Sequence, residues 1–360
     1  MNLSLKYLAQ KWWDNLRYEP NDPRLNAGGL IKIAAIGGGT GLPNLLRGLK
    51  KYSGQISAIV TVTDAGGSTG ELRKDFDMVA PGDIRKCISA LVYDEDLFSA
   101  LLEHRFSKSK RTLGGHTLGN IWITALTDYY KSFEKAVEVT SSIFHTAGTV
   151  YPATLDNVNV CIEYEDGKTY TGEHYLDEIL NKIDKVYLNK KRVKAYKKAV
   201  AAISEADLIL IGPGSLYASL ITNFLVKGIR ESITNNRKAV KIYISNCSTE
   251  RTQTRSFSVE DHIVELQKYG GKRLFDYCLV NNRIIKRSKD ETVLGEVNNI
   301  TTNKKAIEGV EIFKADVINR KNPLFHDRDK LAKAVIDLYN KVRKSQELKA
   351  KSVMLKGHDL

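Results

Sequence analysis

The sequence predicts an α/β protein with a Rossmann-like open sheet, mostly parallel and flanked by helices, and with a β-hairpin insertion. Short apolar runs at residues 31–36, 56–62 and 207–211 each end in a glycine-rich turn, which is typical of buried parallel strands. Helical periodicity follows the first and third of these turns, as expected for crossover helices. An alternation of period two on both sides of Asp166-Gly167 predicts the hairpin.

The order of the elements follows from their periodicities. Apolar residues three or four positions apart predict helices, and these cover residues 3–17, 42–50, 83–93, 96–104, 115–130, 132–144, 195–205, 216–229, 259–269 and 328–346. Apolar or alternating runs predict strands, and these cover residues 31–36, 56–62, 157–164, 168–173, 207–211, 240–244, 277–280 and 309–313. Ser132 is expected to be the N-cap of its helix, because serine hydroxyls accept hydrogen bonds from main-chain N–H groups there.

Three segments are expected along the chain. Residues 1–29 hold an N-terminal amphipathic helix and a linker, and residues 30–325 form an α/β nucleotide-binding domain with its hairpin insertion at about 150–190. Residues 326–360 form a C-terminal helix and a lysine-rich tail that looks disordered. The N-terminal helix is expected to dock on its own domain, and a weak membrane contact or a partner protein is the alternative.

Composition excludes several classes of protein. The 360 residues are 42% hydrophobic and 27% charged, which predicts a packed core and not a disordered chain. No apolar run has the length of a membrane span and no secretory signal is recognised, so a cytoplasmic location is expected. The cysteines are isolated in sequence, which predicts small core residues and neither disulfides nor a zinc site; they are Cys87, Cys161, Cys247 and Cys278.

The chain carries a formal net charge of +13. Nucleic acid, an anionic membrane surface and an anionic small molecule are all attracted by such a field. No zinc-finger, helix-turn-helix or RNA-binding aromatic signature accompanies the basic clusters, so dedicated nucleic-acid binding is not expected and stays a third hypothesis.

Two glycine-rich turns are the candidate phosphate-binding elements. Glycine lets the main chain approach a phosphate closely, and N–H groups at the following helix start point at it. The first turn departs from the G-x-G-x-x-G fingerprint, so tight packing is the alternative to ligand binding there. The second turn favours a ligand, because open parallel sheets bind ligands where neighbouring loops diverge. The candidate residues are Gly38, Gly39, Thr40, Gly41, Gly212, Gly214 and Ser215.

Charged and polar residues near these turns are candidates for chemistry. Asp64 could contact a ribose hydroxyl or share a divalent cation with Asp83, for which a plain helix N-cap is the alternative. Arg85 is a candidate phosphate clamp, because a guanidinium binds phosphate oxygens in bidentate geometry. His116 and Asn120 lie near an expected helix start where a substrate can approach. Acyl hydrolysis, zinc proteolysis and P-loop phosphoryl transfer are not expected, because their motifs do not occur in the sequence.

Five motifs follow one another between about residues 31 and 282. They read I-G-G-G-T-G-L from Ile36, T-V-T-D-A-G-G-S from Thr61, P-G-D-I-R from Pro81, G-H-T-L-G-N from Gly115 and G-P-G-S-L-Y from Gly212. Together they resemble the YvcK/CofD-like family. The second and third motifs resemble its gluconeogenesis-factor branch more than the related 2-phospho-L-lactate transferases.

The resemblance implies a nucleotide ligand, a UDP-sugar with NAD or GDP as alternatives, and a role in cell shape and wall synthesis during gluconeogenic growth. It implies no assigned reaction. Its transferase relatives bind a divalent cation, here Mg²⁺, at carboxylates that correspond to Asp64 and Asp83. With the glycine turns, Arg85 and His116, the candidate nucleotide contacts include Gly66, Gly67, Ser68, Asn120, Asn246 and Thr249.

One loop departs from the pattern of this branch. After Asn246 the branch usually carries M-T-Q-P-G-E-T, whereas this chain reads S-T-E-R-T-Q-T from Ser248 to Thr254. The loss of the Pro-Gly turn alters the loop that is expected to lie over the ligand.

Two functions are therefore expected. The first is a regulatory protein that binds a UDP-sugar and acts on envelope-synthesis or regulatory proteins, as a homo-oligomer. The alternative is a Mg²⁺-dependent transferase that moves a phosphate-linked group from a nucleotide diphosphate donor, with Asp64, Asp83 and His116 as candidate catalytic residues. Turnover of the nucleotide separates the two.

Overall fold

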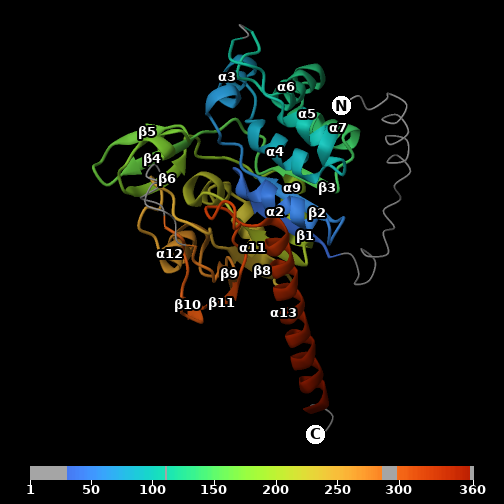
Figure 1. The fold of residues 1–360 in the computed structure, drawn as a ribbon, viewed down its shortest axis with the longest axis vertical. Helices are drawn as coiled ribbons and strands as arrows, with labels where there is room; N and C mark the ends of the chain where they lie inside the picture. The colour runs from blue at the N-terminus through green and yellow to red at the C-terminus, as the bar shows by residue number, and fades with distance from the viewer. Residues whose placement is uncertain (1–30, 110–111, 286–297, 357–360) are drawn as a thin grey trace.

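The computed structural model of the chain describes residues 31–109, 112–285 and 298–356. Within these residues an eight-stranded sheet is flanked by helices, and a three-stranded sheet lies to one side of it (Figure 1). This arrangement confirms the predicted Rossmann-like α/β fold. The helix expected at 3–17 and its linker lie outside the described residues.

The large sheet has the strand order β10-β11-β9-β8-β7-β1-β2-β3. Its strands are β1 (Ile33–Gly37), β2 (Ile56–Val60), β3 (Gly148–Pro152), β7 (Leu208–Ile211), β8 (Val240–Ile244), β9 (Tyr277–Asn281), β10 (Ala306–Ile307) and β11 (Val310–Ala315). Every neighbouring pair is parallel except β10 with β11. The inner strands are nearly continuous apolar runs because helices bury both faces of a parallel sheet.

A separate antiparallel sheet holds the predicted hairpin. Its strands, in the order β5-β4-β6, are β4 (Val160–Tyr164), β5 (Thr169–Thr171) and β6 (Ile183–Leu188). Strands β4 and β5 pair across Asp166-Gly167, which confirms the hairpin. The sequence did not predict β6, because its buried residues Ile183 and Val186 are three positions apart instead of two. It also did not predict β3, which begins and ends with the turn-forming residue types glycine and proline.

The helices agree with the predicted ones to within a few residues, apart from four differences. They are α2 (Gly41–Leu49), α3 (Gly67–Phe76), α4 (Gly82–Leu91), α5 (Ala100–Glu103), α6 (Leu118–Tyr130), α7 (Phe133–Ile143), α8 (Tyr175–Glu178), α9 (Lys197–Glu205), α10 (Thr222–Phe224), α11 (Ile229–Asn235), α12 (Val259–Gly270) and α13 (Arg328–Lys356), with the π-helical turns η1 (Glu95–Ser99) and η2 (Leu216–Ile221). The predicted N-cap is confirmed, since the Ser132 hydroxyl accepts from the N–H of Lys135 at 3.2 Å.

The four differences have local causes. Helix α8 was not predicted, because its four residues are too few to show a helical period. Helix α3 was not predicted, because its sequence opens with Gly67 and Gly70 and has little apolar periodicity. The helix expected at 216–229 is divided into η2, α10 and a separate α11, whose N-cap is Gly228 at φ 108°. Helix α13 continues to Lys356, so the part of the tail that the structure describes is helical and not disordered.

Helix α13 has a buried and a projecting half. Leu331, Val335 and Leu338 are buried, and this half packs on α2. The second half extends away from the rest of the structure (Figure 1). Among the helices that the structure describes, none combines the length and the apolar character that crossing a membrane requires.

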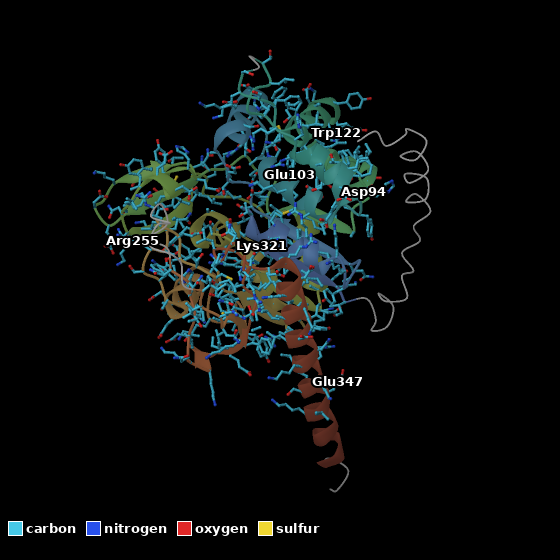
Figure 2. All side chains as sticks on the ribbon, viewed as in Figure 1. Asp94, Glu103, Trp122, Arg255, Lys321 and Glu347 are labelled. Carbon is cyan, nitrogen blue, oxygen red and sulfur yellow. The ribbon has the colours of Figure 1, made fainter. Side chains whose placement is uncertain are left out.

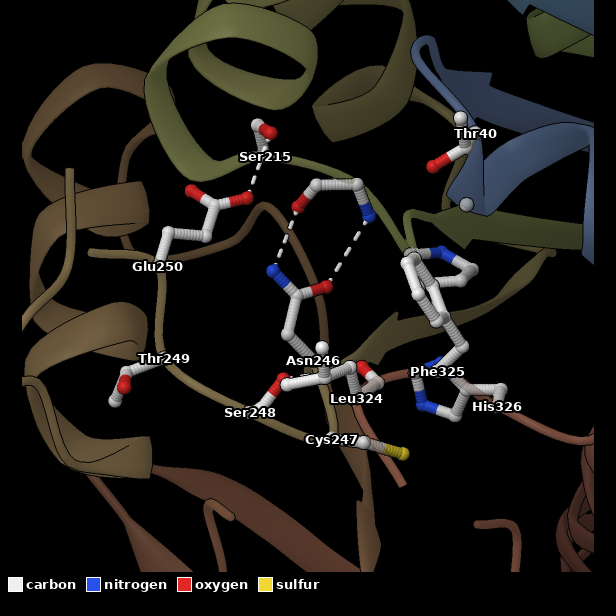
Figure 3. Close-up of a pocket in the computed structure, with 13 residues that line it drawn as sticks. Thr40, Ser215, Asn246, Cys247, Ser248, Thr249, Glu250, Leu324, Phe325 and His326 are labelled. Carbon is white, nitrogen blue, oxygen red and sulfur yellow. Dashed lines mark hydrogen bonds between the residues drawn. The ribbon is translucent and has the colours of Figure 1, made fainter. Parts of the chain in front are cut away.

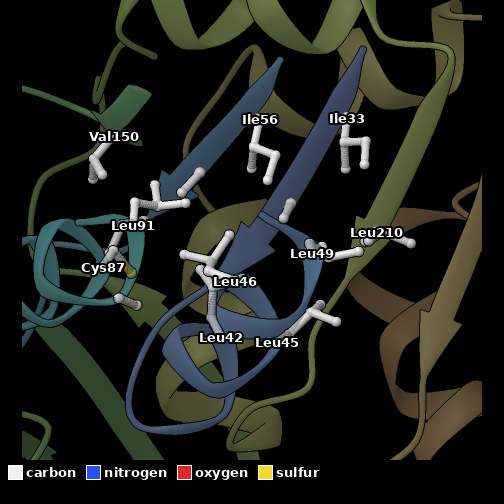
Figure 4. Packing of buried hydrophobic residues seen from close by; sticks show 14 of the residues in the cluster. Ile33, Leu42, Leu45, Leu46, Leu49, Ile56, Cys87, Leu91, Val150 and Leu210 are labelled. Atoms are coloured by element: carbon white, nitrogen blue, oxygen red, sulfur yellow. The ribbon is translucent and has the colours of Figure 1, made fainter. Parts of the chain in front are cut away.

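Alternate residues of β1 contribute to two hydrophobic cores, one on each face of the large sheet. Ile33 and Ala35 pack with α2, α4 and α13, and part of this core is drawn in Figure 4. Ala34 and Ile36 pack with α9, α12 and the small sheet. Successive side chains of a strand point to opposite faces, which explains the division. The cysteines are confirmed as buried free thiols, namely Cys87, Cys161, Cys247 and Cys278.

The strand order reverses between β1 and β7. From β1 the chain proceeds through β2 to β3 at one edge, and it returns on the other side of β1 through β7, β8 and β9. Helix α2 after β1 and η2 after β7 belong to different cores and therefore lie on opposite faces. Such a reversal opens a crevice at the carboxyl ends of the strands, where open α/β sheets bind ligands. The two predicted glycine turns follow these two strands.

Candidate functional site

The glycine turns after β1 and β7 touch each other in this crevice. A Cβ atom on Gly41 would lie 2.5 Å from the carbonyl oxygen of Pro213, so only glycine allows the turns to meet. A Cβ atom on Gly38 would lie 2.8 Å from Oδ2 of Asp83. Tight packing, considered above as the alternative to ligand binding, is therefore one role of these glycines.

A cavity of about 260 Å³ opens between the two turns and the loop after β8 (Figure 3). Phe325 and His326, from the segment before α13, form its other side. The predicted contact residues that line the cavity are Thr40, Gly41, Gly214, Ser215, Asn246 and Thr249. The structure thus brings together residues that the sequence places in three separate loops.

Asn246 ties the loop after β8 to the turn after β7. Its Nδ2 donates to the carbonyl of Gly214 at 2.9 Å, and its Oδ1 accepts from the N–H of the same residue at 3.3 Å (Figure 3). Thr249 connects the loop to the segment at Asn298, because its hydroxyl accepts from the N–H of Asn298 at 3.0 Å. Both predicted residues shape the wall of the cavity.

Glu250 lies in the same wall, beside the second glycine turn. The Ser215 hydroxyl donates to Oε1 of Glu250 at 2.6 Å (Figure 3), while Oε2 is buried with no hydrogen-bond partner in the described part of the chain. Burial raises the pKa of Glu250 to about 7; the charge of Asp177 adds to this rise, and the Ser215 hydrogen bond opposes it. A neutral carboxyl is therefore accessible near neutral pH.

His326 closes the cavity from the side of α13. Its Nε2 donates to the main-chain carbonyl of Ser245 at 3.1 Å. Burial lowers the pKa of His326 to about 4. The imidazole is therefore neutral at physiological pH and adds no positive charge to the site.

Asp83 binds the first glycine turn directly. Its Oδ2 accepts from the N–H of Gly39 at 2.6 Å, and its Oδ1 pairs with Nζ of Lys86 at 2.8 Å. Burial alone would lower the pKa of Lys86, but the charge and hydrogen bond of Asp83 outweigh it and raise that pKa. The N-cap alternative for Asp83 is wrong, because Pro81 holds that position and Asp83 lies in the first turn of α4.

Asp64 lies near Asp83, just after β2. Its Oδ1 accepts from the N–H of Gly66 at 2.9 Å. Burial raises the pKa of Asp64, and the charge of Asp83 raises it further. A third carboxylate, Glu173, accepts from the Thr63 hydroxyl at 3.1 Å. Burial and the charges of Asp64 and Asp83 raise the pKa of Glu173 well above its ordinary range, so a third negative charge is disfavoured at this acidic end of the crevice.

The carboxylates of Asp64 and Asp83 fit a hard divalent cation in their chemistry. Mg²⁺ is usually held by one or two carboxylates, several waters and the phosphates of its substrate. A cation here would relieve the repulsion that raises the pKa of Asp64. In the described ranges, no group of three or more His, Cys, Asp or Glu residues is placed to hold a metal. Waters and phosphate oxygens of a ligand would therefore have to complete the coordination.

Four further predicted residues form one hydrogen-bond network. Ser68 Oγ lies 2.9 Å from Nδ1 of His116 and accepts from Nδ2 of Asn120 at 3.2 Å. Arg85 Nε donates to Oδ1 of Asn120 at 3.0 Å. On its other side, Nε2 of His116 lies 3.3 Å from Oε2 of Glu71. The imidazole of His116 therefore lies between the hydroxyl of Ser68 and the carboxylate of Glu71, an arrangement that can move a proton. No catalytic motif in the sequence indicated this arrangement.

Arg85 holds this network from the protein interior. Its guanidinium pairs with Glu103, which is labelled in Figure 2, and donates to the carbonyl of Leu102 at 3.4 Å. The residue is only 3% exposed. Arg85 therefore positions Asn120, and its predicted contact with a phosphate stays a prediction.

The predicted residues form two groups joined by the first glycine turn. Thr40 and Gly41 line the cavity, whereas the N–H of Gly39 contacts Asp83 on the other side. The second group also contains Gly66, which caps α3, followed by Gly67 at φ 43°. In the turn after β7, the N–H of Gly212 donates to the carbonyl of Ile36 at 2.8 Å. This hydrogen bond joins the carboxyl ends of β7 and β1.

Sequence reasoning missed five residues of the site. Lys86 and Glu71 carried a usable signal, because each lies three positions after a predicted residue on the same helix. Glu250 also carried one, because it follows the predicted Thr249 in the loop that is expected to lie over the ligand. Glu173 and His326 carried none, because they reach the crevice only through long-range packing.

The chain is similar to known proteins along most of its length. The family model described as 2-phospho-L-lactate transferase CofD matches residues 33–318. A candidate gluconeogenesis factor from Aquifex aeolicus is 41% identical over 324 residues, which cover 86% of this chain and 96% of the relative. The gluconeogenesis factor of Bacillus subtilis is 38% identical, and the match covers 85% of this chain and 98% of that protein. A crystal structure of a UPF0052 family protein from Bacillus halodurans has a TM-score of 0.80 at 34% identity, with 85% and 99% of the two chains covered.

Proposed function

The chain belongs to the CofD family, and on this premise we propose that it is a gluconeogenesis factor, a regulatory protein that binds a nucleotide sugar in the crevice between β1 and β7. One observation carries the proposal: two glycine turns meet where the strand order reverses, and they open into a polar cavity. Open parallel sheets bind nucleotides at this position. The names of the relatives from Aquifex aeolicus and Bacillus subtilis support the role.

A UDP-sugar suits the two sides of the crevice. Its pyrophosphate would lie between the first turn, residues 38–41, and the second turn, residues 212–215, where the two turns touch and the cavity opens. The nucleobase would enter the cavity, where Phe325 is 48% exposed and offers an aromatic face. Mg²⁺ held by Asp64 and Asp83 would neutralise the pyrophosphate. NAD and GDP share the pyrophosphate and are the alternative ligands.

The regulatory part of the proposal rests on the family resemblance. A protein that binds a nucleotide sugar without consuming it can report carbon supply to envelope-synthesis or regulatory proteins. The same resemblance suggests a role in cell shape during gluconeogenic growth, and the proposal includes a homo-oligomer. These partners would recognise the ligand-bound form of the chain.

Calorimetric titration followed by product analysis tests the proposal. UDP-N-acetylglucosamine, UDP-glucose, GDP and NAD are titrated into the protein, each with and without Mg²⁺. We expect a UDP-sugar to bind most tightly and to be recovered unchanged. Preferential binding of NAD or GDP would contradict the choice of ligand, and breakdown of the UDP-sugar would contradict the role of a pure sensor.

A transferase is the second candidate, and the network of Ser68, His116 and Glu71 favours it. The network adjoins Asp64, since Gly66 binds that carboxylate two residues before Ser68. In this version His116 takes a proton from an acceptor hydroxyl, and a phosphate-linked group moves from the nucleotide diphosphate to that acceptor. General-base catalysis contributes about a hundredfold or more, so His116→Gln should slow nucleotide release by that factor. Absence of release by the wild type with Mg²⁺ and a panel of hydroxyl acceptors would reject this candidate.

A further inference from the structure

Three strand-to-helix turns at the crevice are each occupied by a carboxylate of the chain itself. The main-chain N–H or hydroxyl donors of such turns are the groups that a ligand phosphate would use. The pairs are Gly39 with Asp83 at 2.6 Å, Gly66 with Asp64 at 2.9 Å and Ser215 with Glu250 at 2.6 Å. A phosphate that arrives at any of these three donors therefore meets a negative charge.

The three carboxylates differ in how their charge is compensated. Lys86 pairs with Asp83, and a divalent cation shared with Asp64 would compensate both acids at that end. Glu250 has a different environment. The charge that acts on Glu250 is that of another acid, Asp177, and its Oε2 is buried without a hydrogen-bond partner in the described structure. Protonation is the direct way to remove the charge of Glu250.

We propose that a phosphate-bearing ligand binds at the second glycine turn together with one proton, which Glu250 takes from solvent. This inference rests on the proposed function and adds a proton linkage to the same site. The proton goes to Oε2, the oxygen that now lacks a partner, and no other bond is made or broken. The neutral carboxyl no longer repels the phosphate.

The titratable groups around Glu250 leave this carboxyl as the proton acceptor. Burial lowers the pKa of His326 to about 4 and raises that of Cys247 to about 12. Both groups are therefore neutral between about pH 6 and 8. Burial also raises the pKa of Tyr243, on β8, well above its ordinary value. Asp177, on α8, acts on Glu250 through its charge. Burial raises the pKa of Asp177, and the hydrogen bond that Gln253 donates to it opposes this rise.

The carboxyl of Glu250 has a pKa suited to this linkage. Burial places it at about 7 before any ligand is present. A phosphate nearby would raise it further, because a like charge disfavours ionisation. By linkage, the ligand must then bind more tightly as the pH falls. The affinity rises as the pH falls because the phosphate and the ionised Glu250 carboxylate are both negatively charged.

Calorimetry with UDP-N-acetylglucosamine tests this proposal. The ligand is suitable because the pyrophosphate of a nucleotide sugar is a diester that does not titrate near neutrality. Titrations between about pH 6 and 8, in buffers of different ionisation enthalpy, report how many protons bind with the ligand. For the wild type we expect uptake approaching one proton and a Kd that rises by up to about tenfold per pH unit above neutrality.

Three variants make the test specific. Glu250→Gln keeps the shape of the side chain and should remove the pH dependence of the Kd, binding at about pH 8 as the wild type does at about pH 6. Asp177→Asn removes the charge that raises the Glu250 pKa, so it should move the midpoint of the pH dependence downward. Glu178→Gln, on the same helix and exposed, is the matched control and should behave as the wild type.

The outcomes separate this inference from the proposed function. If wild type and Glu250→Gln bind the ligand with the same slope against pH, the proton linkage is wrong and nucleotide-sugar binding stands. If none of the four proteins binds the ligand at any pH, the proposed function fails and the inference fails with it. An unchanged midpoint in Asp177→Asn would also contradict the linkage.

Discussion

Gly41 packs on Pro213 so closely that a Cβ atom would lie 2.5 Å from the proline carbonyl oxygen. The contact joins the turn after β1 to the turn after β7, across the point where the strand order reverses. The cavity between these turns therefore depends on two segments that are far apart in sequence. Its shape should be sensitive to a single methyl group.

The first prediction concerns Gly41→Ala. The added methyl group must push the two glycine turns apart, because the atom it meets is main chain and not a flexible side chain. We expect a loss of nucleotide-sugar affinity of at least about tenfold, equal to about 1.4 kcal/mol. Gly54→Ala is the control, since a Cβ atom there meets nothing within 4 Å. Equal affinities of the two variants in a calorimetric titration would contradict the account.

The second prediction concerns Asn246→Ala. This change removes both hydrogen bonds to Gly214, so the turn after β7 loses its contact with the loop after β8. We expect the free energy of unfolding to fall by about 1–3 kcal/mol, because polar groups of the turn lose their partners. Ligand affinity should fall with it. Urea unfolding checks this, with the exposed Asn235→Ala as the control. If the free energy of unfolding falls only in the control, Asn246 does not hold the turn after β7.

The third prediction concerns Asp83→Asn. The asparagine can still accept from the N–H of Gly39 but carries no charge to oppose a phosphate. We therefore expect tighter nucleotide binding without Mg²⁺ and little further gain when Mg²⁺ is added. The comparison is a titration with and without Mg²⁺, with the exposed Asp75→Asn on α3 as control. A variant with the same Mg²⁺ dependence as the wild type would show that Asp83 is not part of a cation site.

The fourth prediction is a pH dependence of stability caused by His326. Its pKa is about 4 in the folded chain, below the ordinary value of 6.5. Between these pH values the unfolded chain binds a proton that the folded chain does not, so the free energy of unfolding should fall as the pH is lowered. The fall is on the order of 2–3 kcal/mol for this group.

Urea unfolding at several pH values isolates the contribution of His326. His326→Gln should lose most of the acid dependence within this window, and the exposed His104→Gln should retain it. The same slope in all three proteins would mean that another group controls acid stability. Glu250 acts in the opposite direction, since its raised pKa makes the folded chain less stable as the pH increases from about 4.5 to about 7.

Much of the framework of the site was predictable from local sequence. The apolar runs of β1, β7 and β8, with the glycine turns that follow β1 and β7, identified the strand ends that surround the cavity. Asn246 was found through a motif, and its pairing with Gly214 follows from the neighbouring positions of β7 and β8 in the sheet. Ser132 was identified as an N-cap because capping depends only on residues within one helical turn.

The remaining features depend on contacts that no local pattern encodes. The Ser68 hydroxyl meets His116 only because α3 packs on α6. Glu173 enters the acidic end from the segment after the small hairpin, and its burial is a property of the whole fold. The helical tail of α13 was misjudged, because its lysines suggested disorder while straight-chain residues also favour helices.

The central claim is that a nucleotide sugar binds between the two glycine turns. The most direct test is a calorimetric titration of UDP-N-acetylglucosamine with Mg²⁺ into the wild type, Gly41→Ala and Gly54→Ala. We expect one binding site per chain in the wild type and in Gly54→Ala, and a strong loss of affinity in Gly41→Ala. Absence of binding in the wild type, or equal binding in all three proteins, would contradict the claim.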